Sequence, residues 1–145
     1  MSDLTQRPPR SARVRLGGFV ILPRLIDKCR ADIAGKAGEY KFNCPLDQRF
    51  FSFMQLDAQA FRREVQSGKG DGELLQWVLQ NAKRKVEDYE IVAWSAWQEQ
   101  RVPSDLDGRE FFHGLHRQSG PDREDIVNWF DLLDLDDYVS FGGKA

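Results

Sequence analysis

Apolar residues recur along much of this chain at the spacing of one face of an α-helix. The clearest stretch has apolar residues at positions i, i+3, i+4, i+7 and i+11, namely Leu22, Leu25, Ile26, Cys29 and Ile33. Side chains at this spacing form a single stripe, which normally faces the protein core. Pro23 suits the first turn of such a helix and Gly35 its end, so we predict a helix between them.

The same periodicity predicts further helices, each opened by a residue that can cap a helix or break the chain. They begin near Cys44-Pro45, Asp57, Asp71, Asp88 and Ser104, and the last has its apolar face from Ile126 onward. Asp and Ser are common caps because they accept hydrogen bonds from the free N–H groups of a first helical turn. No segment alternates apolar and polar residues for long, as a half-buried strand would. We therefore predict an all-α fold, a compact single domain of about seven short helices.

One predicted helix, from about Asp88 to Arg101, has apolar residues nearly all round. They are Tyr89, Ile91, Val92, Ala93, Trp94, Ala96 and Trp97. A helix of this kind is usually buried at the centre of a bundle. We therefore expect this helix to lie inside the domain, with the other helices around it.

The first fifteen residues lack the helical pattern. They include Pro8, Pro9 and the arginines Arg7, Arg10, Arg13 and Arg15. Low hydrophobicity, proline and like charge favour an extended chain. We predict an extended, flexible basic arm over residues 1–15 and a single helical domain over residues 16–145. The stretch 16–22 is β-branched and aromatic, and we expect it to be an extended segment packed on the core.

The charge of the chain is small overall but unevenly distributed. The net charge is −2, yet residues 1–30 carry seven Lys and Arg against two Asp and Glu, whereas residues 86–145 carry five against fourteen. Four aspartates crowd the end of the last helix, namely Asp131, Asp134, Asp136 and Asp137. Carboxylates near a helix C-terminus are unfavourable by themselves. We therefore expect basic residues opposite them, from the arm or from residues 83–85.

Composition excludes several classes of protein. Hydrophobic residues make up 41% and charged residues 30% of the chain, which is the balance of a globular protein. The longest apolar run, residues 16–22, is too short to cross a membrane, and no secretory signal is visible. Two cysteines suit a reducing compartment, so we expect a cytoplasmic protein. A sequence pI of about 5.7 argues against a nucleic-acid partner. No glycine motif for phosphate or dinucleotide binding is present, and we expect no cofactor.

Cys44 is the first candidate for chemistry. Pro45 is expected as the first helical residue, so Cys44 lies at or next to the N-cap, where free N–H groups and the helix dipole stabilise a thiolate. Arg49, one turn further on, would add positive charge, although Asp47 opposes it. Such a thiol could be a nucleophile or a peroxide sensor. Alternatively, Cys44 is a small buried residue at a tight loop-to-helix junction.

The second candidate is a metal site at Glu110, His113 and His116. A spacing of three residues puts side chains on adjoining helical turns, and Glu and His are ligands of zinc and iron. His113 is expected to face solvent, however, and further ligands would have to come from Asp122 or Glu124. The alternative interpretation is one histidine at the core boundary and one exposed histidine.

The third candidate is a partner-binding surface built from the arm and the tail. The arm offers Arg7, Arg10, Arg13 and Arg15, and the tail offers Phe141. Because no tryptophan lies near the arm in the sequence, a protein partner or a self-contact suits it better than nucleic acid. Phe141 either tucks into its own domain or reaches a partner.

Four longer strings carry a family resemblance. They are LPRLIDKCR (22–30), FNCPLDQRFF (42–51), VAWSAW (92–97) and LDLDDYVSFGG (133–143). These strings resemble a bacterial family described as domain of unknown function 5069, over about residues 10–143. The resemblance implies a small, helical, cytosolic bacterial protein of one domain and assigns no catalytic residue. Alanine is common in that family at the position of Cys29, which implies that Cys29 is a core residue.

With no motif for a reaction, three function classes remain. We favour a small interaction or regulatory module over an enzyme, with a protein partner or a second copy of the chain as its ligand. The first alternative is a thiol-based enzyme or redox sensor that uses Cys44. The second is a protein that binds a metal ion or a small ligand.

Overall fold

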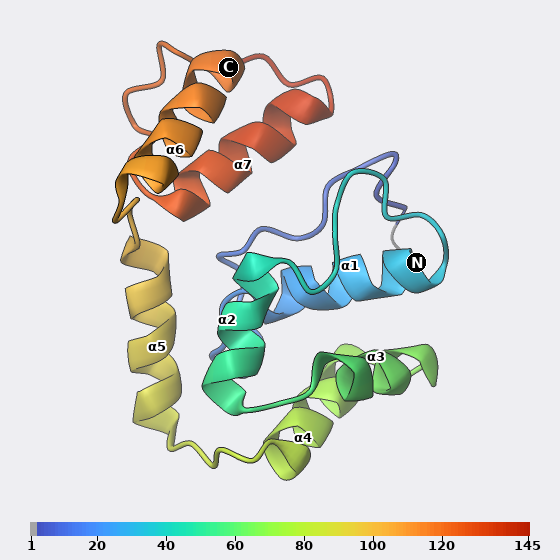
Figure 1. The fold of residues 1–145 in the computed structure, drawn as a ribbon. Coiled ribbons are helices and arrows are strands. Elements are labelled where there is room, and N and C mark those ends of the chain that lie inside the picture. Colours follow the sequence, from blue (N-terminus) through green and yellow to red (C-terminus); the bar gives the residue numbers. More distant parts are fainter. Residues whose placement is uncertain (1–2) are drawn as a thin grey trace.

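The computed structural model describes residues 3–145, and in this range the chain is all-α, as predicted. The helices are α1 (Leu22–Ile33), α2 (Pro45–Met54), α3 (Ala58–Gln66), α4 (Asp71–Asn81), α5 (Asp88–Gln100), α6 (Leu106–Ser119) and α7 (Trp129–Ser140) (Figure 1). Strand-like pairing in the described range is limited to one isolated bridge between Leu16 and Phe19. None of the helices described there has the length and apolar character needed to cross a bilayer.

The main core forms where the segment before α1 meets α1 to α5. Phe19, Val20 and Ile21 have no exposed surface, so this segment packs on the core as expected. Phe50 of α2 is equally buried and makes edge-to-face contacts with Phe19 and Phe51, at centroid distances of 5.3 and 5.7 Å. Full burial of such a side chain stabilises a fold by roughly 1.5–3 kcal/mol. Phe50 therefore holds α2 and the segment before α1 together.

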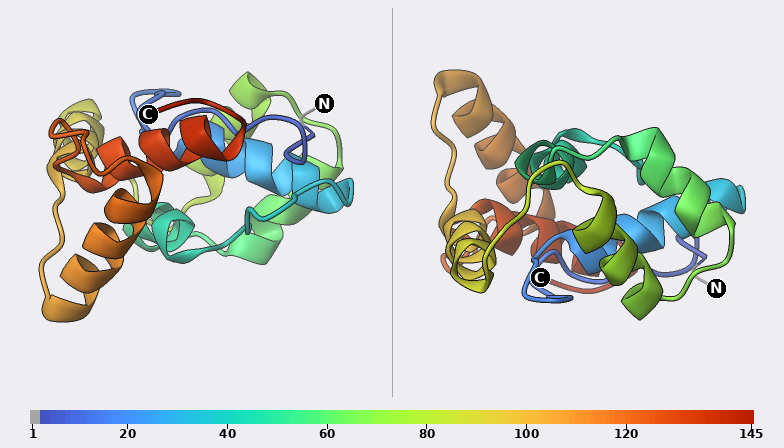
Figure 2. Two further views of the ribbon diagram at one scale, coloured as in Figure 1. Left: turned by 90° about the horizontal axis from the view of Figure 1, so that it is seen from above. Right: turned by 90° about the horizontal axis from the view of Figure 1, so that it is seen from below.

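Helices α6 and α7 lie side by side and run in roughly the same direction, with a small core of their own (Figure 1). Four buried residues make it up, namely Phe112, Ile126, Leu132 and Leu135. Helix α7 lies against the rest of the domain, whereas α6 packs mainly on α7 and projects outward (Figure 2). The pair therefore depends on α7 for its attachment to the main core.

Capping residues decide where the helices begin. Helix α2 begins at Pro45 with Cys44 as its N-cap, and the Asp57 carboxylate accepts a hydrogen bond from the Ala60 N–H at 2.9 Å, both as predicted. The start of α7 was predicted too early. Its N-cap is Asn128, whose side chain accepts from the N–H of Asp131 at 2.9 Å. Apolar spacing alone does not mark a helix start, because apolar residues before the cap are buried too.

Two other starts differ from the prediction by one residue. Gly70, not Asp71, is the N-cap of α4, and Asp105, not Ser104, is the N-cap of α6. The Asp105 side chain accepts from the N–H of Gly108 at 2.6 Å. As the first helical residue, Asp71 keeps its carboxylate available for ion pairs with arginines of the arm and of α1.

The prediction that α5 is the buried centre of the domain is wrong. Tyr89 and Trp97 on this helix are 72% and 58% exposed, and α5 lies at one side of the domain (Figure 1). Its buried face carries Ser95, whose hydroxyl donates to the Gly18 carbonyl oxygen at 2.6 Å and accepts from the Val20 N–H at 3.1 Å. A helix that is apolar all round has no preferred side. The buried hydrogen bonds of Ser95 fix that side here.

Residues 3–15 form an extended basic segment, but not the free arm that we expected. Leu4 and Ala12 are buried, and the segment runs between α1 and α7 (Figure 1). Carboxylates on the helices neutralise its arginines, so the repulsion between like charges that favours an arm in solvent is removed. The first two residues of the predicted arm lie outside the described range.

Candidate functional site

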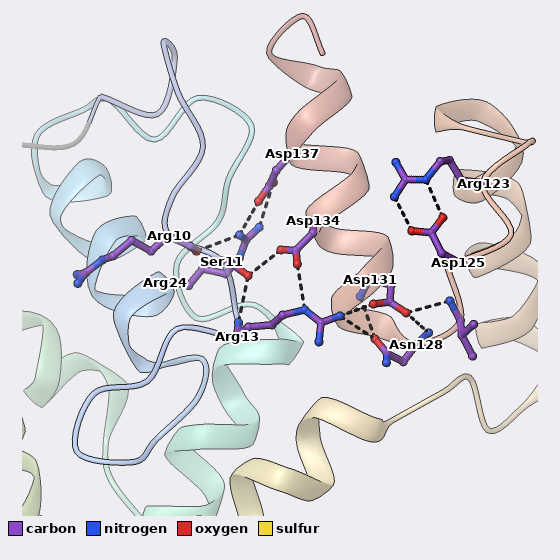
Figure 3. Close-up of polar contacts among 11 residues, drawn as sticks. Arg10, Ser11, Arg13, Arg24, Arg123, Asp125, Asn128, Asp131, Asp134 and Asp137 are labelled. Atoms are coloured by element: carbon purple, nitrogen blue, oxygen red, sulfur yellow. Dashed lines mark hydrogen bonds and ion pairs between the residues drawn. The ribbon is translucent and has the colours of Figure 1, made fainter. Parts of the chain in front are cut away.

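The arginines of the arm, predicted to bind a partner, are engaged mainly within the chain, and Figure 3 shows this for Arg13 with Asp131 and Asp134. Ion pairs join Arg10 to Asp27 and Asp71, Arg13 to Asp131 and Asp134, and Arg15 to Glu99. Arg7 is exposed. The arm thus supplies the basic residues expected opposite the aspartates of α7. The arm therefore forms a contact between helices of its own domain, and fewer of its arginines remain available to bind a partner.

A buried polar cluster behind the arm fastens α7 to α1. Nη1 of Arg24 donates to Oδ2 of Asp137 at 2.7 Å, and the Tyr40 hydroxyl donates to Oδ1 of Asp137 at 2.6 Å. Burial and the hydrogen bond to Asp137 raise the pKa of Tyr40 above its usual value, so it remains a donor at neutral pH. Phe141 stacks on Tyr40 with ring centroids 6.5 Å apart. The tail therefore packs against its own domain, one of the two roles considered for it.

The predicted metal site is not formed. Within residues 3–145, no group of three or more His, Cys, Asp or Glu side chains is placed to hold a metal ion. Nε2 of His116 lies 2.7 Å from the carbonyl oxygen of Arg123 and closes the turn between α6 and α7, while Glu110 and His113 are exposed. Helical spacing aligns the three side chains, but a metal site also needs ligands from another element.

Cys44 lies at the start of α2, where a buried lysine contacts its thiol. Nζ of Lys28 donates to Cys44 Sγ at 3.1 Å and to the Lys41 carbonyl oxygen at 3.2 Å, and it pairs with Asp47 at 2.9 Å. Lys28 therefore places a positively charged group directly against the sulfur atom. Cys44 is half-buried, whereas Cys29 has no exposed surface. Burial raises the pKa of the Cys29 thiol to about 12.

The cation next to Cys44 is Lys28 and not Arg49, which the sequence suggested. The Arg49 guanidinium lies over the ring of Trp97, 5.8 Å from its centroid. Sequence reasoning missed Lys28 because a lysine on a helix is usually at the surface. The available signal was its position three residues after Leu25, at the edge of the apolar stripe of α1.

An aromatic groove of about 980 Å³ runs between α2, α5 and the α6–α7 pair, and we call it the tryptophan groove. Its aromatic lining consists of Phe53, Trp94, Trp97, Phe111 and Trp129. Phe53 and Trp94 stack with centroids 4.9 Å apart and form a flat wall. Trp97 and Phe111 are 58% and 64% exposed, so they border the opening. The groove therefore presents a large aromatic surface to solvent.

A second cavity of about 980 Å³ also borders Cys44, and we call it the Cys44 pocket. Arg24, Lys28 and Asp136 contribute to its polar lining. Burial and the neighbouring charge of Asp137 raise the pKa of Asp136. Cys44 lines both cavities, so the thiol lies where they meet.

The tryptophan groove also contains positive charge. Arg49, Arg84 and Arg101 line it. Arg84 pairs with Glu90 at 3.1 Å and lies over the ring of Phe53 at 4.6 Å. The groove thus combines aromatic faces with guanidinium groups, the side chains that contribute most of the binding energy in many protein interfaces.

Comparison with known protein families gives one match over nearly the whole chain. A family model described as "Domain of unknown function (DUF5069)" matches residues 6–139. The match confirms the resemblance found in the four sequence strings. No curated protein matches the chain.

Proposed function

This chain belongs to the DUF5069 family, and within that family's helical fold we propose that it is a protein-interaction module whose tryptophan groove binds an extended segment of a partner protein. The proposal places the module in a bacterial cytoplasm, which its two free cysteines support. The arm and the buried cluster of Arg24 serve this module by holding α7, one wall of the groove, against α1.

The observation that carries the proposal is the exposed aromatic surface of the groove. Trp97 and Phe111 are each more than half exposed at its border, and Trp94 and Trp129 line it below them. Large exposed apolar surface next to polar side chains is typical of sites that bind proteins. A small-molecule site would enclose most of its ligand, whereas a border this exposed suits a longer peptide segment.

A test is selection of a random dodecapeptide phage library on the wild-type protein. We expect peptides whose affinity falls about thirtyfold in Trp97→Ser, because tryptophans are among the side chains that most often contribute about 2 kcal/mol or more to an interface. Tyr89→Ser is the matched control, since Tyr89 is exposed on the same helix outside the groove. Peptides that bind both variants as well as the wild type would contradict the proposal. Dimerisation of the wild-type protein that is lost in Trp97→Ser would instead assign the groove to a second copy.

A thiol-based activity is the second candidate function, because Lys28 donates to Cys44 Sγ. A positively charged neighbour and a position at a helix start are typical of reactive cysteines. The Cys44 pocket gives the thiol a cavity that a small oxidant or electrophile could enter.

The thiol candidate predicts fast and selective alkylation. With iodoacetamide at pH 7, Cys44 of the folded protein should react about tenfold or more faster than glutathione. Cys29 should stay unlabelled until the protein unfolds, because it has no exposed surface. Peptide mapping by mass spectrometry measures both rates, and Cys44→Ser checks the assignment. A Cys44 that reacts more slowly than glutathione would rule this candidate out.

A further inference from the structure

We propose that the partner segment bound by the tryptophan groove is acidic, with carboxylate side chains that meet the arginines of the groove. This inference rests on the proposed function, because it names the chemistry of the segment that the groove takes. Three observations carry it: the charge of the lining, two arginines without an anion, and a buried amide without a partner.

The lining of the groove is positively charged although the protein is acidic overall. Arg49, Arg84 and Arg101 are among the lining residues, and those that the structure describes include no Asp and no Glu. The whole chain has 23 Asp and Glu and a net charge of −2. Complementary charge across an interface speeds association and selects partners. A negatively charged segment therefore matches this lining better than a neutral or basic segment.

Two of these arginines lack the anionic partner that arginines of the arm have. Within residues 3–145, the side chains of Arg49 and Arg101 form no hydrogen bond or ion pair; each lies over the ring of Trp97, 5.8 and 6.0 Å from its centroid. Burial lowers the pKa of both groups, and repulsion from Arg49 helps to lower that of Arg101, to about 10. A carboxylate in the groove would supply the partner that the fold does not.

Gln98 adds a hydrogen-bonding group to the same wall. It lines the groove and is 2% exposed, and its Oε1 has no hydrogen-bond partner in the described part of the chain. A buried carbonyl oxygen without a partner destabilises a fold, so a ligand N–H would satisfy it. Gln98 and Arg101 are three residues apart and lie on neighbouring turns. An acidic residue of a peptide offers both a main-chain N–H for Gln98 and a carboxylate for Arg101.

A nucleic acid also combines anions with rings that stack, but the groove favours a peptide. Nucleic acids present a phosphate every few Å, and their binding surfaces spread many Lys and Arg along them. Here only Arg49 and Arg101 are without an anion among the described arginines of the groove. The groove also belongs to a protein whose sequence pI is about 5.7, well below the value typical of nucleic-acid-binding domains.

The test uses the peptides selected from the dodecapeptide library on the full-length protein. We expect them to be richer in Asp and Glu than the unselected library, and replacing these residues by Asn and Gln should weaken binding about tenfold or more. Arg49→Ser and Arg101→Ser should each weaken binding about tenfold. Arg63→Ser, on the exposed surface of α3, is the matched control and should leave the dissociation constant unchanged. Fluorescence anisotropy measures each constant, and thermal unfolding checks that each variant is folded.

Gln98→Met separates binding from folding. Because the Gln98 amide oxygen has no partner in the free protein, this change should raise the melting temperature while it weakens peptide binding. A melting temperature that falls together with binding would assign Gln98 to the fold and remove it from the site.

The outcomes distinguish this inference from the proposed function. Peptides that need Trp97 but bind equally well after Asp and Glu are neutralised would overturn the inference and leave the proposed function standing. A library with no Trp97-dependent peptide would overturn both. A fluorescent single-stranded oligonucleotide that binds more tightly than the peptides, and that loses binding in Arg101→Ser, would replace the acidic peptide by a nucleic acid.

Discussion

Replacement of Lys28 by methionine is expected to lower the free energy of unfolding by about 3–5 kcal/mol. The Lys28 side chain is 4% exposed and that of Asp47 is fully buried, with Nζ and Oδ1 2.9 Å apart. Methionine keeps the length and most of the packing of lysine but removes the charge. The Asp47 carboxylate is then left buried with one remaining strong contact, the N–H of Asn43. Urea denaturation followed by circular dichroism measures the loss.

A double variant tests whether the loss of stability in Lys28→Met comes from the unpaired Asp47 carboxylate. Lys28→Met combined with Asp47→Leu removes both charges, and replacement of a buried ion pair by apolar side chains is often neutral. We therefore expect the double variant to recover most of the stability that the single variant loses. A single variant that loses less than about 1 kcal/mol would show that water reaches the pair and that Lys28 is not a buried anchor for Asp47 and Cys44.

Replacement of Phe50 by alanine is expected to cost a similar amount, about 3–5 kcal/mol. Phe50 has no exposed surface and contacts the rings of Phe19, Phe51 and Trp94. The change removes these contacts and leaves a cavity under the wall of the tryptophan groove. Thermal and urea unfolding measure the loss of stability, and intrinsic tryptophan fluorescence reports the change around Trp94.

An exposed aromatic residue provides the control for Phe50. Tyr89→Ala removes a ring that is 72% exposed on α5, so the free energy of unfolding should change by less than about 0.5 kcal/mol. Equal losses in both variants would contradict the central position of Phe50 in the core.

The helices could be predicted from the sequence because their signals are local. The stripe of α1, proline at the start of α2 and the Asp57 cap each lie within one or two helical turns, and the structure confirms all three. The position of α5 could not be predicted in the same way. Its buried side depends on Ser95 bonding to residues about 75 positions earlier in the chain, and helical periodicity contains no information about such a contact.

Fewer features of the candidate site than of the helices could be predicted from the sequence. The N-cap position of Cys44 followed from Pro45, which is its neighbour in the chain. Lys28 reaches the thiol only because α1 packs on α2, and Arg49 of α2 reaches the ring of Trp97 only because α5 lies beside α2. The charge imbalance between the two ends of the chain predicted that something basic faces α7. It did not predict that these ion pairs would fix the arm against the helices instead of leaving it free in solvent.

The contact between the arm and α7 also orders events during synthesis. Arg13 and Asp134 are 121 residues apart in the chain, and a ribosome adds about 5–20 residues per second. Arg13 is therefore synthesised roughly ten seconds before its two acidic partners on α7. During that interval the Arg13 guanidinium is available to any acidic surface near the nascent chain. Docking of α7 ends this interval, and a chain that stops before Asp131 leaves Arg13 without either of its carboxylate partners.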